Sequence, residues 1–223
     1  MPKIRNIYEV WNSFLFLPKA TIMKYFFILS FLFCCSVISA QDETFISESK
    51  AEQMKLNEEF SNPETTILDP EDFKNFHGLE FYPINEKFIV EAKFVRTPDE
   101  KPFLMPTTTS RTPEYVKYGE AHFSLDGKDF VLSLFKSTQP YDEPGYEDYL
   151  FLPFTDLTSG DGSYGGGRFL DQRIPEGDTI IIDFNKAYNP YCAYSARFSC
   201  PIPPKENDLL IRIEAGVMDF GKH

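Results

Sequence analysis

The dipeptide Asp126-Gly127 places the strongest constraint on the fold, because it lies between two segments in which apolar and polar residues alternate. Both residues of a two-residue hairpin turn need positive φ, and Asp-Gly is one of the pairs that adopt it most readily. The segments 115–125 and 128–136 are therefore predicted to be antiparallel strands joined by this turn. Further strands are predicted at 88–95, 149–152 (ended by Pro153), 178–184 and 209–215.

The residues before the predicted strands favour helices. Ser49-Lys50-Ala51-Glu52 has the form of a capping box, and the apolar residues Leu56 and Phe60 follow it one helical turn apart. Asn62-Pro63 is expected to end this helix, because a residue that precedes proline avoids the helical region.

A second, short helix is predicted from Asp69 as the N-cap and Pro70 at the first helical position, and it is expected to end at Gly78. No long helical pattern follows, so the fold class is predicted to be mainly β. We expect a single antiparallel barrel or sandwich-like domain with one or two short N-terminal helices. Its helical segment would cover about 45–78 and its β region about 79–223.

The beginning of the chain has the pattern of a targeting segment. Met23-Lys24 is followed by an apolar run over 25–38 and then by Ser39-Ala40, which is the order of a signal peptide cleaved after Ala40. We expect a spurious upstream extension at 1–22, a signal peptide at 23–40 and a mature domain at 41–223, exported to the periplasm or the extracellular space without a stable membrane anchor. A short uncleaved anchor is the alternative, although the apolar run falls short of the ~20 residues of a spanning helix.

Cleavage after Ala40 can be checked on exported protein. Mass spectrometry should find Gln41 at the N-terminus, free or cyclised, because the small residues before it suit a signal peptidase. Recovery of a chain that still begins at Met23 would refute the cleavage.

The net charge of −12, from 34 acidic and 22 basic residues, bears on the partners. A nucleic-acid site needs clustered Lys and Arg to meet the phosphates, and no basic run is present, so no nucleic acid is expected. Asp156, Asp161 and Gly162 contain only fragments of a calcium loop, so a polar turn is favoured there, and neither a metal nor a cofactor is expected. The expected partner is a small molecule or an envelope protein.

Removal of the signal peptide would also remove Cys34 and Cys35, and would leave one pair, Cys192 and Cys200. In an exported chain, such a pair indicates a disulfide bond that closes a short loop. A nucleophilic or metal-binding cysteine is the alternative.

Two loops between the later strands concentrate Gly, Tyr, Asn and Arg. Their motifs are TSG (158–160), YGGGRFLD (164–171), DFN (183–185) and AYNPYCAY (187–194), and CPIPP (200–204) follows. In this order, the motifs closely resemble domain of unknown function family 1684, which occurs in bacteria and archaea. The resemblance covers most of the mature chain and implies a single compact domain, but it implies no activity.

These loops are predicted to form a pocket for a small polar or anionic ligand. Amides of successive glycines can surround an anion, and Arg168 could add a bidentate charge. The alternative is a glycine-rich bulge with Arg168 paired to a structural Asp. The tyrosines could form an amphipathic wall for sugars, aromatic ligands or a partner surface, or they could belong to the core. The predicted ligand-binding residues are Tyr164, Gly165, Gly166, Gly167, Arg168, Asn185, Tyr188, Asn189 and Tyr191.

Catalysis is the competing hypothesis. The chain has no G-x-S-x-G and no H-E-x-x-H motif, so a hydrolase or other enzyme would depend on carboxylates. Asp183 or Asp171 would act as the base, and Tyr164 or Arg168 would stabilise charge. Asp183 could equally cap its own loop. A structural or interaction protein of the envelope is the third hypothesis.

Overall fold

The structure, a computed structural model, describes residues 44–141 and 144–221. The predicted upstream extension and signal peptide therefore lie outside the described residues. Residues Ile46–His223 form one compact unit, separate from Met1–Phe45. In the described part of the chain, no helix is both long and apolar enough to cross a membrane.

The secondary structure of the described residues is mainly β. Residues 44–61 are helical. The remaining elements are α3 (Pro70–Lys74), η1 (Glu86–Phe88), β1 (Ile89–Arg96), β2 (Phe103–Leu104), β3 (Glu114–Leu125), β4 (Lys128–Ser137), β5 (Tyr149–Asp156), β6 (Arg168–Arg173), β7 (Thr179–Asp183), η2 (Phe184–Lys186), η3 (Tyr191–Ala193), η4 (Lys205–Asn207) and β8 (Asp208–Leu209).

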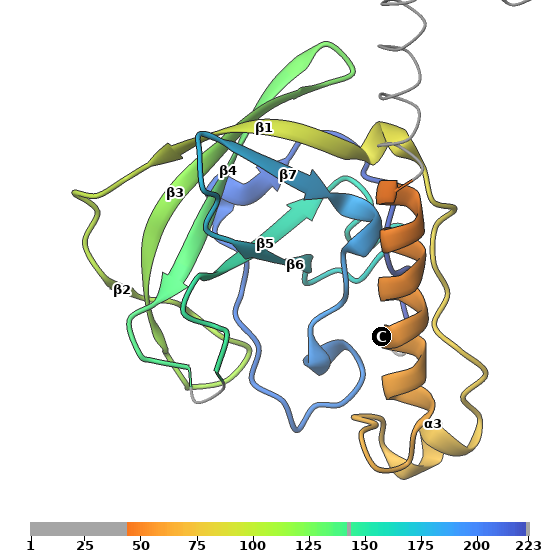
Figure 1. Ribbon diagram of the computed structural model, residues 1–223. Helices are drawn as coiled ribbons and strands as arrows, with labels where there is room; N and C mark the ends of the chain where they lie inside the picture. Colours follow the sequence, from red (N-terminus) through yellow and green to blue (C-terminus); the bar gives the residue numbers. More distant parts are fainter. Residues whose placement is uncertain (1–43, 142–143, 222–223) are drawn as a thin grey trace, which may run out of the picture. The chain divides into compact units, whose positions relative to one another are not determined.

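The strands form one curled sheet of the half-barrel kind (Figure 1). Its order is β6-β5-β4-β3-β1-β7, with β2 added beside β3 and β8 added beside β5. Neighbours along this order are antiparallel, and among the strands that the structure describes the short β5–β8 pair is the parallel one. The predicted mainly β, antiparallel, barrel-like fold is therefore confirmed.

The predicted hairpin at Asp126-Gly127 is confirmed. Asp126 has φ of 52° and Gly127 has φ of 71°, so both turn residues lie in the left-handed region that a two-residue turn requires. The turn sets the register of β3 and β4, in which Leu125 opposes Lys128 and the pairing continues to Tyr115 and Ser137. This long hairpin forms the middle of the sheet (Figure 1).

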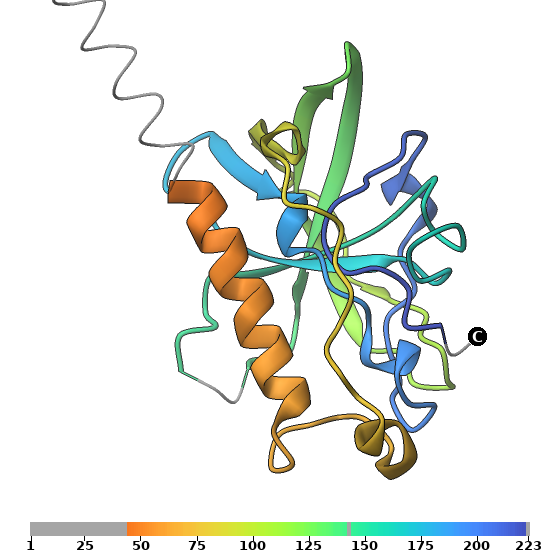
Figure 2. The same ribbon diagram turned by 90° about the vertical axis from the view of Figure 1, so that its right-hand side faces the viewer.

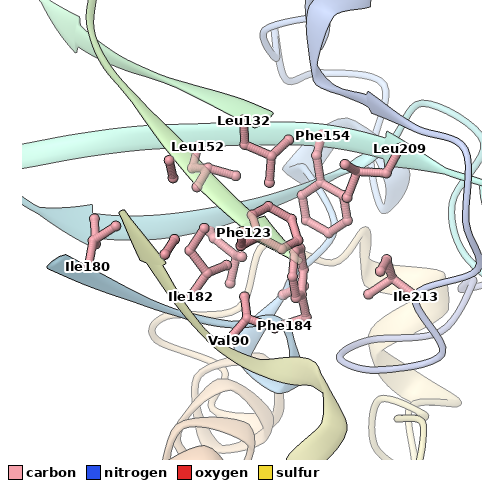
Figure 3. Packing of buried hydrophobic residues seen from close by; sticks show 14 of the residues in the cluster. Val90, Phe123, Leu132, Leu152, Phe154, Ile180, Ile182, Phe184, Leu209 and Ile213 are labelled. Carbon is pink, nitrogen blue, oxygen red and sulfur yellow. The ribbon is translucent and has the colours of Figure 1, made fainter. Parts of the chain in front are cut away.

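The concave face of the sheet encloses the main core. Figure 3 shows Val90 from β1, Phe123 from β3, Leu132 from β4, Leu152 from β5 and Ile182 from β7 pointing into one cluster. Each contributes because alternate residues of a strand point to the same face. Full burial of one such side chain stabilises the fold by about 1.5–3 kcal/mol.

The opposite face of β4, β5 and β6 carries a second apolar cluster. Phe135, Phe151 and Phe169 are buried there with Cys192 and Cys200. The rings of Phe151 and Phe169 meet edge to face, with their centroids 4.8 Å apart. Because β5 is covered on both faces, its sequence is a continuous apolar run rather than an alternating one.

Strand β5 continues beyond Pro153, where the sequence predicted its end. Proline has no N–H to donate to a neighbouring strand, and the β4–β5 pairing is limited to Phe135 opposite Phe151. The buried Asn207 supplies the missing hydrogen bonds: its Nδ2 donates to the carbonyls of Ser133 and Pro153 at 2.9 and 2.7 Å, and its Oδ1 accepts from the Ser133 N–H at 2.8 Å. An amide side chain thus takes the place of strand backbone.

The helical predictions are partly confirmed. The first helix ends at residue 61, before Asn62-Pro63, as expected. It does not begin at Ser49, which lies inside the helix, is buried, and donates to Asp183 at 2.5 Å. Helix α3 begins at Pro70 after Asp69, as predicted, but ends at Lys74 rather than at Gly78. Figure 2 shows the first helix and this short helix joined below the sheet.

Asn207→Ala should lower the free energy of unfolding by about 3 kcal/mol or more, because it leaves buried N–H and C=O groups of β4 and β5 without partners. Urea denaturation measures the loss. Asp208→Ala is the matched control, because its side chain is exposed and accepts only from Thr155; it should change stability by about 0.5 kcal/mol or less. Equal effects of the two substitutions would contradict the role of Asn207.

Candidate functional site

Arg168 lies inside the protein, so the prediction that it binds a ligand from solvent is wrong. Its side chain is fully buried, and its Nη2 donates to Asp156 Oδ1 at 3.0 Å and to the carbonyl of Ile213 at 2.8 Å. Its Nη1 donates to the carbonyl of Ala215. Burial lowers the pKa of Arg168, while the Asp156 carboxylate beside it opposes that shift. The alternative, a structural Arg–Asp pair, is the arrangement found.

The other oxygen of Asp156 completes this buried network. Its Oδ2 accepts from the N–H of Thr158 at 3.0 Å and from the N–H of Ile213 at 2.7 Å. The predicted strand at 209–215 is therefore wrong beyond Leu209, where Asp156 and Arg168 bond the backbone of Ile213 and Ala215, and the Ile211 carbonyl accepts from the Leu157 N–H at 3.0 Å. Asp156 and Asp161, which the sequence showed as fragments of a calcium loop, both have protein partners: Asp156 pairs with Arg168, and Asp161 forms an ion pair with Arg212 at 2.7 Å.

The triple glycine forms the turn that brings Arg168 into the core. The Gly167 N–H donates to the carbonyl of Tyr164 at 3.1 Å, and Gly167 has φ of +87°. A Cβ on Gly167 would lie 2.5 Å from the carbonyl oxygen of Phe154, so only glycine fits. Gly165 and Gly166 are exposed. With Arg168 turned inward, these glycines lack the cation that was expected to add to their anion site.

Asp183 and Asn185 act as loop caps. Both are buried, and Asp183 Oδ1 accepts from the N–H and the Nδ2 of Asn185 at 3.0 and 2.9 Å. Asn185 also exchanges hydrogen bonds with the backbone of Asn85, at 2.9 and 3.1 Å. Asn189 is buried as well and donates to the carbonyl of Met218 at 2.9 Å. None of the three faces solvent, so the predicted roles of Asp183 as a base and of the asparagines in ligand binding are not supported.

Asp171 is different, because it is exposed and two tyrosines converge on it. The hydroxyls of Tyr149 and Tyr188 each donate to Asp171 Oδ1 at 2.7 Å. Its Oδ2 has no hydrogen-bond partner among the described residues. The two predicted loops therefore meet at Asp171, at the outer edge of the second apolar cluster.

Strand register explains this convergence. Asp171 opposes Phe151 in the β5–β6 ladder, so Tyr149, two residues before Phe151, is its diagonal neighbour on the same face. Phe169 pairs with Tyr188 in an isolated bridge, and Asp171 is two residues beyond Phe169 on that same face. Both phenols thus reach one carboxylate.

Further tyrosines extend this surface. The rings of Tyr141 and Tyr146 lie 5.2 and 5.6 Å from the ring of Tyr149, centroid to centroid. We call Tyr141, Tyr146, Tyr149, Tyr188 and Asp171 the tyrosine patch. The sequence-based predictions did not single out Tyr141, Tyr146 or Tyr149. Their close spacing could have indicated them, as could the position of Tyr149 two residues before Phe151, which places both side chains on the same face of β5.

Burial raises the pKa of three phenols of the tyrosine patch, those of Tyr141, Tyr149 and Tyr188. It raises the pKa of Tyr141 to about 12, and it raises the pKa of Tyr149 and of Tyr188 further, with the nearby Asp171 carboxylate adding to the rise. The hydroxyls of Tyr149 and Tyr188 donate to Asp171 and keep lone pairs that can accept.

A pocket of about 260 Å³ adjoins the tyrosine patch. Tyr141 and Tyr146 form one wall, so the rings that contact Tyr149 also face this space. The complete lining is Lys136, Ser137, Thr138, Gln139, Pro140, Tyr141, Tyr146 and Glu147.

Cys192 and Cys200 are neighbours but are not bonded. Both are free, buried thiols, and the Cys192 N–H donates to Cys200 Sγ at 3.2 Å. Tyr164 is half-buried, with its hydroxyl 3.8 Å from Cys192 Sγ. Hydrogen bonds from Cys200 and Tyr164 lower the pKa of Cys192. The structure gives no support to the predicted disulfide, which stays a prediction. Tyr191, the last predicted ligand residue, is 43% exposed.

Arg168→Met should lower the free energy of unfolding by about 3–5 kcal/mol, because it leaves the buried Asp156 carboxylate without its cation. Urea denaturation followed by circular dichroism measures this. Arg212→Met, which removes an exposed partner of Asp161, is the control and should have a much smaller effect. If Arg168→Met left stability unchanged, the buried pair would not be structural.

The comparisons with known proteins agree with this fold. A family model described as protein of unknown function (DUF1684) matches residues 74–218. The solution NMR structure of an uncharacterised protein from Haloarcula marismortui is similar, with 31% sequence identity and a TM-score of 0.65, over 82% of this chain and 99% of that chain. No curated protein matches. The predicted family is therefore confirmed: the chain belongs to the family of proteins of unknown function DUF1684.

Proposed function

We propose that this protein is an exported binding domain that holds a neutral, polyhydroxylated ligand of the sugar class at the tyrosine patch. The observation that carries the proposal is the convergence of the Tyr149 and Tyr188 hydroxyls on one oxygen of an exposed carboxylate, at 2.7 Å each. Export follows from the signal-peptide pattern of the sequence.

The hydrogen-bonding capacity of the tyrosine patch favours hydroxyl groups. Asp171 Oδ1 is engaged by two phenols, which fixes the plane of the carboxylate, and Oδ2 remains open to accept. Each phenol oxygen that donates to Asp171 still has lone pairs. A ligand that offers several O–H donors matches such a fixed set of acceptors.

The aromatic faces supply the apolar half of the interaction. Tyrosine combines a broad ring with a polar end, so it binds ligands that have both C–H faces and hydroxyls. The rings of Tyr141, Tyr146 and Tyr149 lie within 5.2 to 5.7 Å of one another, centroid to centroid. Tyr141 and Tyr146 also line the adjoining pocket of about 260 Å³.

The charge of the tyrosine patch argues against the anionic ligand that the sequence suggested. The cation expected to bind an anion, Arg168, is buried against Asp156. The charge at the centre of the patch is instead the Asp171 carboxylate, which repels anions. Of the polar or anionic ligands that the sequence suggested, we therefore propose a neutral, polyhydroxylated one.

The proposal is tested by titrating the protein with N-acetylglucosamine and with cellobiose, followed by thermal shift and tyrosine fluorescence. The single tryptophan of the sequence, Trp11, lies in the segment expected to be absent after processing, so tyrosine emission should be observable. At least one probe should raise the melting temperature. Asp171→Asn and the double variant Tyr149→Phe with Tyr188→Phe should each weaken binding about tenfold, the effect of about 1.4 kcal/mol of lost hydrogen bonding.

Matched controls separate binding from folding. Tyr118→Phe and Asp161→Asn change the same residue types outside the tyrosine patch, and both should retain the parent affinity. Spermidine and citrate serve as cationic and anionic probes. Binding of citrate, or equal sugar affinity in Asp171→Asn and the parent, would contradict the proposal.

A further inference from the structure

A second concavity shares no lining residue with the tyrosine patch. It has a volume of about 470 Å³ and lies where the chain before β1 meets the segment after β8. Ile46, Tyr82, Ile84 and Phe88 supply most of its apolar lining. We call it the Tyr82 pocket, and its volume lies within the range of small-molecule sites.

The charged residues that line the Tyr82 pocket are both acidic, and they are Glu86 and Glu214. Glu86 forms no ion pair with any residue that the structure describes. Glu214 Oε1 accepts from Arg212 Nε at 3.0 Å, but Arg212 is shared with Asp161 at 2.7 Å. The carboxylates at the pocket are therefore not fully compensated by protein cations.

Each cation near the pocket has a carboxylate partner, and for Arg212 one of these is the pocket residue Glu214. Lys87, next to Glu86 in the chain, pairs with Asp126 at 2.7 Å, and its Nζ lies 5.3 Å from the centre of the ring of Phe88, which lines the pocket. Arg168 lies 6.0 Å from the centre of the Tyr82 ring, but it is buried and paired with Asp156 at 3.0 Å. Among the described residues, Glu86 is therefore the pocket carboxylate that has no ion pair, whereas Glu214 is paired with Arg212.

We propose that the Tyr82 pocket binds an organic cation, a ligand with an ammonium group and an apolar body. The apolar body would bury against Ile84 and Phe88, while the ammonium group would lie between the carboxylates of Glu86 and Glu214. Burial of the apolar body supplies affinity, and the carboxylates select cations over neutral or anionic molecules of the same shape. This site does not depend on the function proposed for the tyrosine patch.

The test compares two probes with the same chain, octyltrimethylammonium and octyl sulfate, by isothermal titration calorimetry below their critical micelle concentrations. The protein is purified after expression of the full chain. Octyltrimethylammonium should bind at one site and octyl sulfate should not. Glu86→Gln and Glu214→Gln should each raise the dissociation constant about fivefold, the effect expected for loss of one exposed charge pair.

Glu176→Gln is the matched control, because Glu176 is exposed and lies outside the pocket lining. It should bind octyltrimethylammonium as the parent does, and so should Asp171→Asn, which changes only the tyrosine patch. Both pocket glutamates are exposed, and thermal melting verifies that their variants fold. Equal binding of the two probes, or the same dissociation constant for Glu86→Gln, Glu214→Gln and Glu176→Gln, would overturn the proposal.

Discussion

The buried ion pair between Arg168 and Asp156 determines how the end of the chain packs against the sheet. Two charges in an apolar interior are costly unless their mutual attraction and further hydrogen bonds offset the loss of water. Here the pair uses the backbone of 213–215: Arg168 donates to the carbonyls of Ile213 and Ala215, and Asp156 accepts from the Ile213 N–H. The last segment can therefore cross the core without pairing as a strand.

Buried polar side chains also bond to the backbone at the places where the sheet is interrupted. Asn207 takes the place of a strand between Ser133 and Pro153, and Asn185 joins the loop after β7 to the backbone of Asn85. Each polar side chain is buried because it satisfies backbone groups that no ladder reaches. Motifs rich in Asp, Asn, Arg and Gly, which in loops often indicate binding, here mainly build the architecture.

The features that the sequence predicted well depend on neighbouring residues. The Asp126-Gly127 turn and the start of α3 at Pro70 are set within a few positions. The errors concern residues whose partners are distant: Arg168 and Ile213 are 45 residues apart, and Pro153 depends on Asn207, 54 residues later. No local pattern contains those pairings. For the site, the sequence indicated Asp171 and Tyr188, but joining them to Tyr149 required the β5–β6 register.

Several residues of the sequence motifs lie in the interior, so few of their charged groups are available to a ligand at the surface. The inward turn of Arg168 removes the cation that would have made the glycine loop an anion site, and the exposed carboxylate of Asp171 remains beside aromatic rings. The Tyr82 pocket has the same character, with apolar walls and the uncompensated Glu86. Because Arg168 is used internally, the exposed carboxylates of Asp171 and Glu86 are the groups on which we base the proposals of a hydroxyl-bearing and of a cationic ligand.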